Sequence, residues 1–140
     1  MQQTETYNLK LIETSDPFSP DALNENARKV DALLRGQLMF STGEYTGDGQ
    51  VGKEYPKRLE FDFKPLIVWV FNATTGAFGH FAWLRGTIQG CTYQYNAAPS
   101  TVNLTWEDRA VQWYYNGTSS RTQLTENGTR YVYMAIGVLD

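Results

Sequence analysis

Segments in which apolar and polar residues alternate, separated by turns rich in glycine and asparagine, fill the chain from residue 40 onward. In Arg58–Phe63 (RLEFDF), three apolar side chains fall on one side and two acidic side chains on the other, as expected for a strand with one buried face. The same period of two recurs in residues 101–106 (TVNLTW) and 110–115 (AVQWYY), and residues 130–138 (RYVYMAIGV) are typical of one more strand. Roughly seven to nine short strands are expected, which indicates an antiparallel sandwich or barrel. We therefore predict a mainly β fold, specifically an antiparallel β-sandwich.

Two other segments refine this prediction. Residues 65–71 (PLIVWVF) are apolar at every position, which is typical of a strand covered on both faces. Residues 107–109 (EDR) predict a short hairpin connection between the strands on either side of them.

The stretch GDGQVGKE, residues 47–54, has the spacing of a phosphate-binding loop but lacks its chemistry. Glu54 stands where that loop needs a hydroxyl residue, and Pro56 prevents a helix from following. We interpret the stretch as a glycine-rich hairpin loop whose positive-φ positions are supplied by Gly43, Gly47, Gly49 and Gly52.

The first forty residues differ in kind from the rest. Residues 7–11 (YNLKL) alternate and predict a short extended arm. Residues 16–36 (DPFSPDALNENARKVDALLRG) predict one amphipathic helix that is capped by Ser19, begins at Pro20 and ends at Gly36. A staple contact between Phe18 and Leu23 is expected at its start. We therefore predict two parts: residues 1–40, an arm and helix for attachment and oligomerisation, and residues 41–140, a β-sandwich module.

An apolar stripe runs along the predicted helix. Its members are spaced by four, three and four residues, a heptad seam of about two heptads that is too short for a stable free coiled coil. The stripe either packs on the protein's own sheet or contacts another subunit, and the sequence favours neither. As an assembly interface it consists of Leu23, Ala27, Val30 and Leu34.

Composition excludes several classes of function. A net charge of −3 with scattered Lys and Arg argues against a nucleic-acid partner. The single cysteine, Cys91, excludes an intrachain disulfide framework and a multi-cysteine zinc site, and its alternation with Tyr93 and Tyr95 predicts that it packs in an apolar interior. The apolar run Leu66–Phe71 is too short to insert into a membrane as a spanning helix, and no basic and apolar leader opens the sequence. We expect a chain made in the cytosol, without a cofactor.

Candidates for catalysis are few. His80 is the only histidine, so no multi-histidine metal site is expected, and we assign it a structural or surface role. Glu60 with Asp62, and Glu107 with Asp108, are the paired carboxylates that a small glycan hydrolase would need. The first pair is also expected simply because it lies on the solvent-exposed face of a strand, and the second because it lies in a turn. We therefore expect no enzyme.

Aromatic residues reach 14% of the chain. In residues 110–115, Trp113 and Tyr115 share one face while Tyr114 points to the other, so aromatic side chains are exposed or covered by a neighbour. Aromatic rings beside amides suit sugar faces. Tyr114, Asn116 and Arg121 are the predicted contacts, to a glycan or to a partner subunit, and neither partner is favoured.

The order of several segments resembles the tail-fibre and baseplate-associated proteins of phages and prophages of Gram-positive bacteria. The segments are DPFSPDALNENARKVDALL, GEYTGDG, RLEFDFKPLIVWV, LTWEDRAVQWYY and QLTENGTRYVYMAIG. The resemblance implies a non-enzymatic virion structural protein, commonly a homotrimer, that attaches to other virion tail proteins through its N-terminal region.

The resemblance also implies a place and a role. The virion, assembled in the host cytoplasm, is the expected location. Because the chain has no extended repeat or shaft, a short fibre, tip or baseplate decoration is favoured, with contact to a bacterial surface glycan as an added role. A free-standing glycan-binding β-sandwich is the alternative, and a small glycan hydrolase is the second alternative.

Overall fold

The computed structural model of the chain describes residues 2–5, 7–11, 20–74, 82–92 and 98–139. The chain divides into two compact units, Met1–Gln37 and Leu38–Asp140. The first holds the arm and one helix, and the second holds the strands. Each unit is described by itself.

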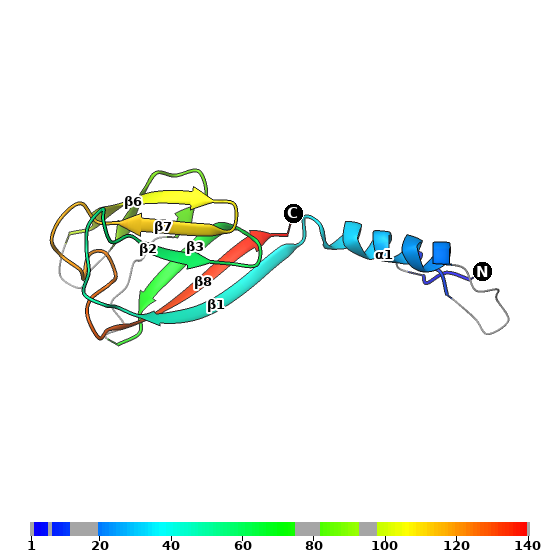
Figure 1. Cartoon of the computed structure of the whole chain (residues 1–140), viewed down its shortest axis with the longest axis horizontal. Helices are drawn as coiled ribbons and strands as arrows, with labels where there is room; N and C mark the ends of the chain where they lie inside the picture. Colours follow the sequence, from blue (N-terminus) through cyan, green and yellow to red (C-terminus); the bar gives the residue numbers. More distant parts are fainter. Residues whose placement is uncertain (1, 6, 12–19, 75–81, 93–97, 140) are drawn as a thin grey trace. The chain divides into compact units, whose positions relative to one another are not determined.

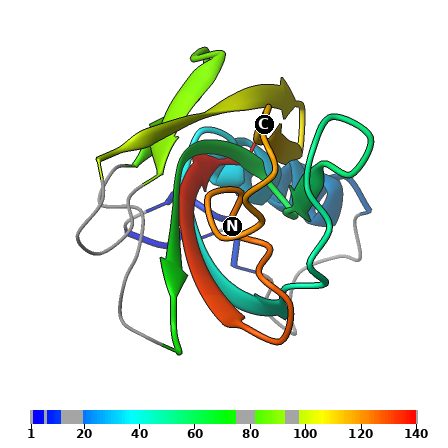
Figure 2. The same cartoon turned by 90° about the vertical axis from the view of Figure 1, so that its left-hand side faces the viewer.

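The second unit is built from two four-stranded antiparallel sheets, with strand orders β1-β8-β3-β4 and β2-β7-β6-β5. Figure 2 shows β1, β8 and β3 side by side as one curved layer, with the other sheet across from it. The predicted antiparallel β-sandwich is confirmed. The strands, labelled where there is room in Figure 1, are β1 (Leu38–Thr46), β2 (Lys57–Glu60), β3 (Lys64–Asn72), β4 (Trp83–Leu84), β5 (Gln89–Thr92), β6 (Ser100–Glu107), β7 (Ala110–Tyr114) and β8 (Arg130–Val138).

The core lies between the sheets and is dominated by aromatic and β-branched side chains. Trp83 of one sheet meets Trp113 of the other edge-to-face, with ring centroids 4.8 Å apart. Tyr45 and Tyr131, which are paired across β1 and β8, stack at 5.1 Å. Full burial of a large apolar side chain is worth about 1.5–3 kcal/mol, so this cluster supplies much of the unit's stability. Its other members include Leu59, Phe61, Phe63, Val68, Val70, Val102, Leu104 and Val111.

Two predictions about the strands are confirmed. Residues 59, 61 and 63 are buried and residues 60 and 62 are exposed, although β2 itself ends at Glu60. The predicted hairpin joins β6 to β7, with Glu107 paired to Ala110.

The prediction that residues 65–71 are covered on both faces is wrong. Val68 and Val70 are buried in the core, but Ile67, Trp69 and Phe71 point to the opposite side of β3 and are only half-buried. The apolar run therefore serves two surfaces, the core and the outer face of its sheet.

The glycine-rich stretch is a loop, but not a hairpin, because residues 47–56 connect β1 and β2, which lie in different sheets. Gly49 and Gly52 have positive φ angles of 80° and 107°, as predicted. Gly43 and Gly47 do not have positive φ angles. Glycine is needed at these two positions because other atoms approach too closely for a side chain. A Cβ at Gly43 would lie 2.3 Å from the Tyr133 hydroxyl oxygen, and one at Gly47 would lie 2.1 Å from the Glu126 carbonyl oxygen.

The prediction for Cys91 is also wrong, because this residue is exposed. In β5 the buried positions are Gly90 and Thr92. The Trp83 indole packs against Gly90, where a Cβ would approach it to 2.6 Å, and its Nε1 donates to the Cys91 carbonyl oxygen at 3.1 Å. Gly90 must therefore face inward, because only glycine leaves room for the Trp83 ring, and its neighbour Cys91 then faces outward.

In the first unit, α1 spans Pro20–Leu34, and Gly36 follows it with a φ of 74°. The helix thus begins where the sequence predicted, while Phe18 and Ser19 lie outside the described residues. The predicted extended arm is instead the return leg of a small fold-back. Gln3 pairs with Lys10 as an antiparallel bridge, and Asn8 turns the chain with a φ of 54°. In the described part of the chain, no helix has the length and apolar character needed to cross a membrane.

Candidate functional site

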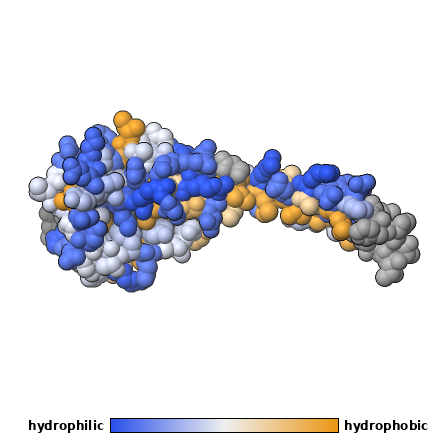
Figure 3. Space-filling model, in the orientation of Figure 1, coloured by the Kyte–Doolittle hydropathy of each residue, from blue (hydrophilic) through white to orange (hydrophobic). Residues whose placement is uncertain are grey.

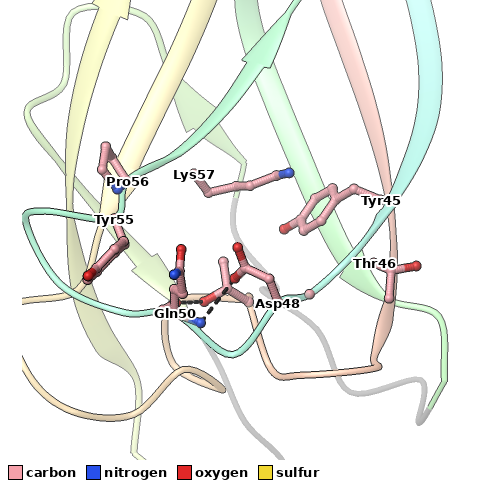
Figure 4. A pocket seen from close by; sticks show the side chains of 9 residues that line it. Tyr45, Thr46, Asp48, Gln50, Tyr55, Pro56 and Lys57 are labelled. Atoms are coloured by element: carbon pink, nitrogen blue, oxygen red, sulfur yellow. Dashed lines mark hydrogen bonds between the residues drawn. The ribbon is translucent and has the colours of Figure 1, made fainter.

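The loop between β1 and β2 borders a small polar pocket at one end of the sandwich (Figure 4). The cavity has a volume of about 70 Å³. A cavity of about 10–15 Å³ already admits one water molecule, so the pocket has room for a small chemical group but not for a whole drug-sized ligand. Its lining residues are Tyr45, Thr46, Gly47, Asp48, Gln50, Tyr55, Pro56, Lys57 and Thr125.

A buried glutamine holds this loop in place. Gln123 is 0% exposed, and its Oε1 accepts hydrogen bonds from the backbone N–H of Gly52 at 2.9 Å and of Tyr115 at 2.8 Å. Its Nε2 donates to the Tyr55 carbonyl oxygen at 2.8 Å. The Trp113 indole in turn donates to the carbonyl oxygen of Gln123 at 2.7 Å. The loop is therefore tied to the core, and the side chains that it carries are pre-positioned.

Lys57 places a cation at this pocket. Its ammonium nitrogen lies 4.0 Å from the centroid of the Tyr45 ring, and Figure 4 shows it pointing toward that ring. Burial lowers the pKa of Lys57, and the Asp48 carboxylate partly offsets this effect. The Tyr45 hydroxyl donates to the Leu124 carbonyl oxygen at 2.8 Å, and burial raises the pKa of this phenol well above its usual value. The pocket thus joins a neutral phenol ring, an ammonium group and a carboxylate.

In the first unit, the arm occupies one side of α1. Asn26 forms two hydrogen bonds with the backbone of Lys10, accepting at Oδ1 and donating from Nδ2, both at 2.8 Å. Lys29 donates to the Asn8 carbonyl oxygen at 2.7 Å, and Glu25 forms ion pairs with Lys10 and Lys29. These contacts use the polar side of the helix.

The predicted stripe lies on another side of the same helix. Leu23, Val30 and Leu34 are 42–48% exposed, and Ala27 is exposed as well. Figure 3 shows hydrophobic atoms gathered along one side of α1 and polar atoms along the other. Within the first unit, the four predicted residues therefore lie together on one side of α1 that the arm does not cover.

No protein-family model, curated protein or solved structure matches this chain. Function is therefore inferred from the chain's own surfaces and from the resemblance of its sequence segments.

The other predicted contact residues lie at the end of β7 and in the segment after it. Tyr114 is half-buried at the end of β7, Asn116 is exposed just after it, and no hydrogen bond or ion pair joins either of them to Arg121 in the described part of the chain. Arg121 instead pairs with Glu126 at 3.0 Å.

The predicted carboxylate pairs are tied to arginine. Glu60 and Glu107 both bind Arg58, and the Arg58 hydrogen bond holds the pKa of Glu107 below its usual value. A glycosidase acid needs a raised pKa, so this cluster does not favour glycan hydrolysis. His80 lies outside the described residues. Within the described ranges, no group of three or more His, Cys, Asp or Glu residues is placed to hold a metal ion.

The sequence did not indicate the pocket or its anchor. Gln123 lies in a polar segment, SSRTQLTENG, with no period that distinguishes a buried amide from an exposed one. Lys57 and Tyr45 are brought together because β1 and β2 lie in facing sheets, which is a long-range consequence of the fold.

Proposed function

We propose that this chain is a non-enzymatic structural protein of a phage or prophage tail: a short fibre, tip or baseplate decoration that self-associates through α1. The observation that carries the proposal is the apolar stripe, which the arm of the same unit leaves exposed. Leu23, Val30 and Leu34 stay 42–48% exposed although the arm binds the polar side of the same helix. Burying such side chains against a second helix stabilises an assembly, because each contributes up to about 1.5–3 kcal/mol when fully buried.

The tail context comes from the resemblance of the sequence segments, which also implies a homotrimer in the virion. A heptad seam fits this role, since a/d-type spacing places apolar residues along the line where helices meet. A stripe of two heptads is too short to hold isolated helices together. The rest of each chain would therefore add contacts to the assembly.

The test is the solution mass of the full chain, measured by light scattering. We expect an oligomer for the wild type and a monomer for Val30→Asp with Leu34→Asp, because two carboxylates in the seam would face their copies. The matched control is Asn24→Asp with Ala32→Asp, which adds equal charge to exposed positions of α1 outside the stripe. A monomeric wild type, or a folded seam variant that keeps the oligomeric mass, overturns the proposed self-association.

The tail assignment has its own test. Mass spectrometry of purified particles from the host that carries the gene would detect this chain in stoichiometric amount with other tail proteins. Its absence from the particles would overturn the assignment while leaving self-association standing.

A second candidate function, glycan binding, is favoured by the pocket. Tyr55 is 48% exposed beside a cavity that presents an ammonium group, a carboxylate and an amide. An aromatic face beside such groups suits a sugar ring and its hydroxyls. An array of bacterial surface glycans, probed with the wild type, with Tyr55→Ala and with Tyr114→Ala, would test both this site and the predicted Tyr114 contact. No binding by the wild type would exclude the function for these glycans.

A further inference from the structure

Three dipeptides in the loops of the second unit consist of aspartate or asparagine followed by glycine: residues 48–49, 116–117 and 127–128. At such a dipeptide, the backbone nitrogen of the glycine can attack the side-chain carbonyl carbon of the residue before it and close a cyclic imide. Glycine permits this attack most readily, because no Cβ restricts its backbone or shields its nitrogen. The attack also requires that the nitrogen is free to lose its proton and to turn toward the side chain.

The two asparagine sites share their local sequence. Residues 116–118 and residues 127–129 both read Asn-Gly-Thr, and at each site the asparagine and the glycine are exposed to solvent. Neither the residues that follow the asparagine nor its exposure therefore distinguishes one site from the other. A difference in reactivity between them has to come from the hydrogen bonds of the two glycine nitrogens.

At Asn127, the nitrogen of the following glycine is held by a hydrogen bond. The Gly128 N–H donates to the Gly47 carbonyl oxygen at 3.0 Å, and the Gly47 N–H donates to the Thr129 carbonyl oxygen at 2.9 Å. The same two loops are joined again where the Gly49 N–H, which belongs to the Asp-Gly dipeptide, donates to a carbonyl oxygen at residue 125 at 2.8 Å. The nitrogens of Gly49 and Gly128 each point at an acceptor on another segment, so this bond must open before either nitrogen can attack.

At Asn116, the nitrogen of the following glycine is free. Residues 116–118 form an exposed bend just after β7, and in the part of the chain that the structure describes no hydrogen bond involves the Gly117 N–H or the Asn116 side chain. The residue before the bend is fixed, because the Tyr115 N–H donates to Oε1 of the buried Gln123 at 2.8 Å. Packing also requires glycine in the bend, since a Cβ at Gly117 would lie 2.5 Å from the Tyr115 ring.

We propose that Asn116 is a site of spontaneous deamidation in the folded protein, and that Asn127 is protected although the same two residues follow it. The Gly117 nitrogen loses its proton to water or hydroxide and forms a bond to Cγ of Asn116. The Cγ–Nδ2 bond breaks, and the amide nitrogen takes a proton from water and leaves as ammonia. Water then adds to one of the carbonyl groups of the imide, which gives aspartate or isoaspartate. Water is the only co-reactant, and no group is oxidised or reduced.

The modification changes charge and backbone at one defined place. A neutral amide becomes a carboxylate, so the net charge becomes one unit more negative than −3. In the isoaspartate product, the main chain also runs through the Cβ of residue 116, which lengthens the bend by one bond. Asn116 is one of the residues predicted to contact a glycan or a partner subunit, so the new charge would fall at that predicted contact. The proposal depends neither on the stripe of α1 nor on the loop pocket.

The size of the expected difference follows from the hydrogen bond at Gly128. A backbone hydrogen bond of ordinary strength shifts the equilibrium between its closed and open forms by about two- to ten-fold. The bonds of Gly47 and Gly49 hold the same two loops together, so several bonds have to open at once. We therefore expect Asn116 to deamidate at least about ten-fold faster than Asn127 in the folded protein.

Peptide mapping tests this expectation on the unmodified full chain. Trypsin places the two asparagines on separate peptides, residues 110–121 and residues 122–130. The folded protein is incubated at mildly alkaline pH and digested at intervals, and mass spectrometry measures the fraction of each peptide in which the amide has become an acid. In a parallel sample unfolded in urea, the two rates are expected to become similar. Equal rates in the folded protein, a faster reaction at Asn127, or a ratio of rates that urea leaves unchanged overturns the proposal.

Two matched variants give an independent measurement. Glutamine keeps the amide but has to close a larger ring, so Asn116→Gln and Asn127→Gln each remove one reactive site without a change of charge. Isoelectric focusing of the folded protein is expected to show a more acidic form that accumulates with time in the wild type and in Asn127→Gln, and much more slowly in Asn116→Gln. An acidic form that accumulates in Asn116→Gln as fast as in the wild type overturns the proposal.

Discussion

Replacement of Gln123 by methionine tests whether a single buried amide fixes the loop of the candidate site. Methionine fills nearly the same volume but offers no donor and only a weak acceptor. The change leaves the N–H groups of Gly52 and Tyr115 and the carbonyl of Tyr55 without their partner. An unsatisfied buried polar group costs about 1–3 kcal/mol, and these three are partly shielded, so we expect a loss of about 3 kcal/mol in the free energy of unfolding.

Urea unfolding followed by tryptophan fluorescence measures this loss, since the Trp113 indole is bonded to the same residue. A loss of that size lowers the melting temperature of a unit of about 100 residues by roughly 12 °C. Gln50→Met is the matched control, because the Gln50 side chain is exposed on the same loop, and its effect is expected within about 0.5 kcal/mol. A Gln123→Met protein that loses less than about 1 kcal/mol would refute the anchoring role.

Two further predictions concern close packing and pH. Gly47→Ala is expected to lose about 2 kcal/mol or more in urea unfolding, because the added methyl would lie 2.1 Å from the Glu126 carbonyl oxygen; an unchanged midpoint would contradict this. Burial raises the pKa of Tyr45, so its contribution to stability is complete below about pH 10, the value of an exposed tyrosine, and is lost as the pH rises further. The urea midpoint is therefore expected to fall between pH 9 and pH 11, and less steeply in Tyr45→Phe. Equal slopes of the urea midpoint against pH in the two proteins would contradict the assignment. A smaller slope is expected to remain in Tyr45→Phe, because burial also raises the pKa of Tyr131.

Periodicity and capping predicted the elements of this fold well, because both depend on residues that are close in sequence. The alternation in residues 58–63 predicted which side chains are buried, and residues 130–138 were predicted to form a strand. Pro20 predicted the first residue of α1, and Gly36 predicted its end.

Features that depend on distant residues were not predicted. Cys91 is exposed because Trp83 needs a glycine next to it, and nothing within CTYQY reports that contact. The run PLIVWVF correctly indicated two apolar faces but not that one of them stays uncovered by the chain's own second sheet. Gln123 was missed because its three partners lie on other segments of the chain.

The position of β8 at the centre of its sheet, between β1 and β3, has a consequence for how the protein is synthesised. The strands β2, β7, β6 and β5 have all been made once residue 114 emerges from the ribosome, so their sheet can form early. Until β8 is made, several seconds later at about 5–20 residues per second, β1 has no partner strand and β3 has only the two-residue strand β4. During that interval their apolar side chains and unpaired edges are exposed, which favours aggregation. The synthesis of β8 therefore ends the exposure of both strands.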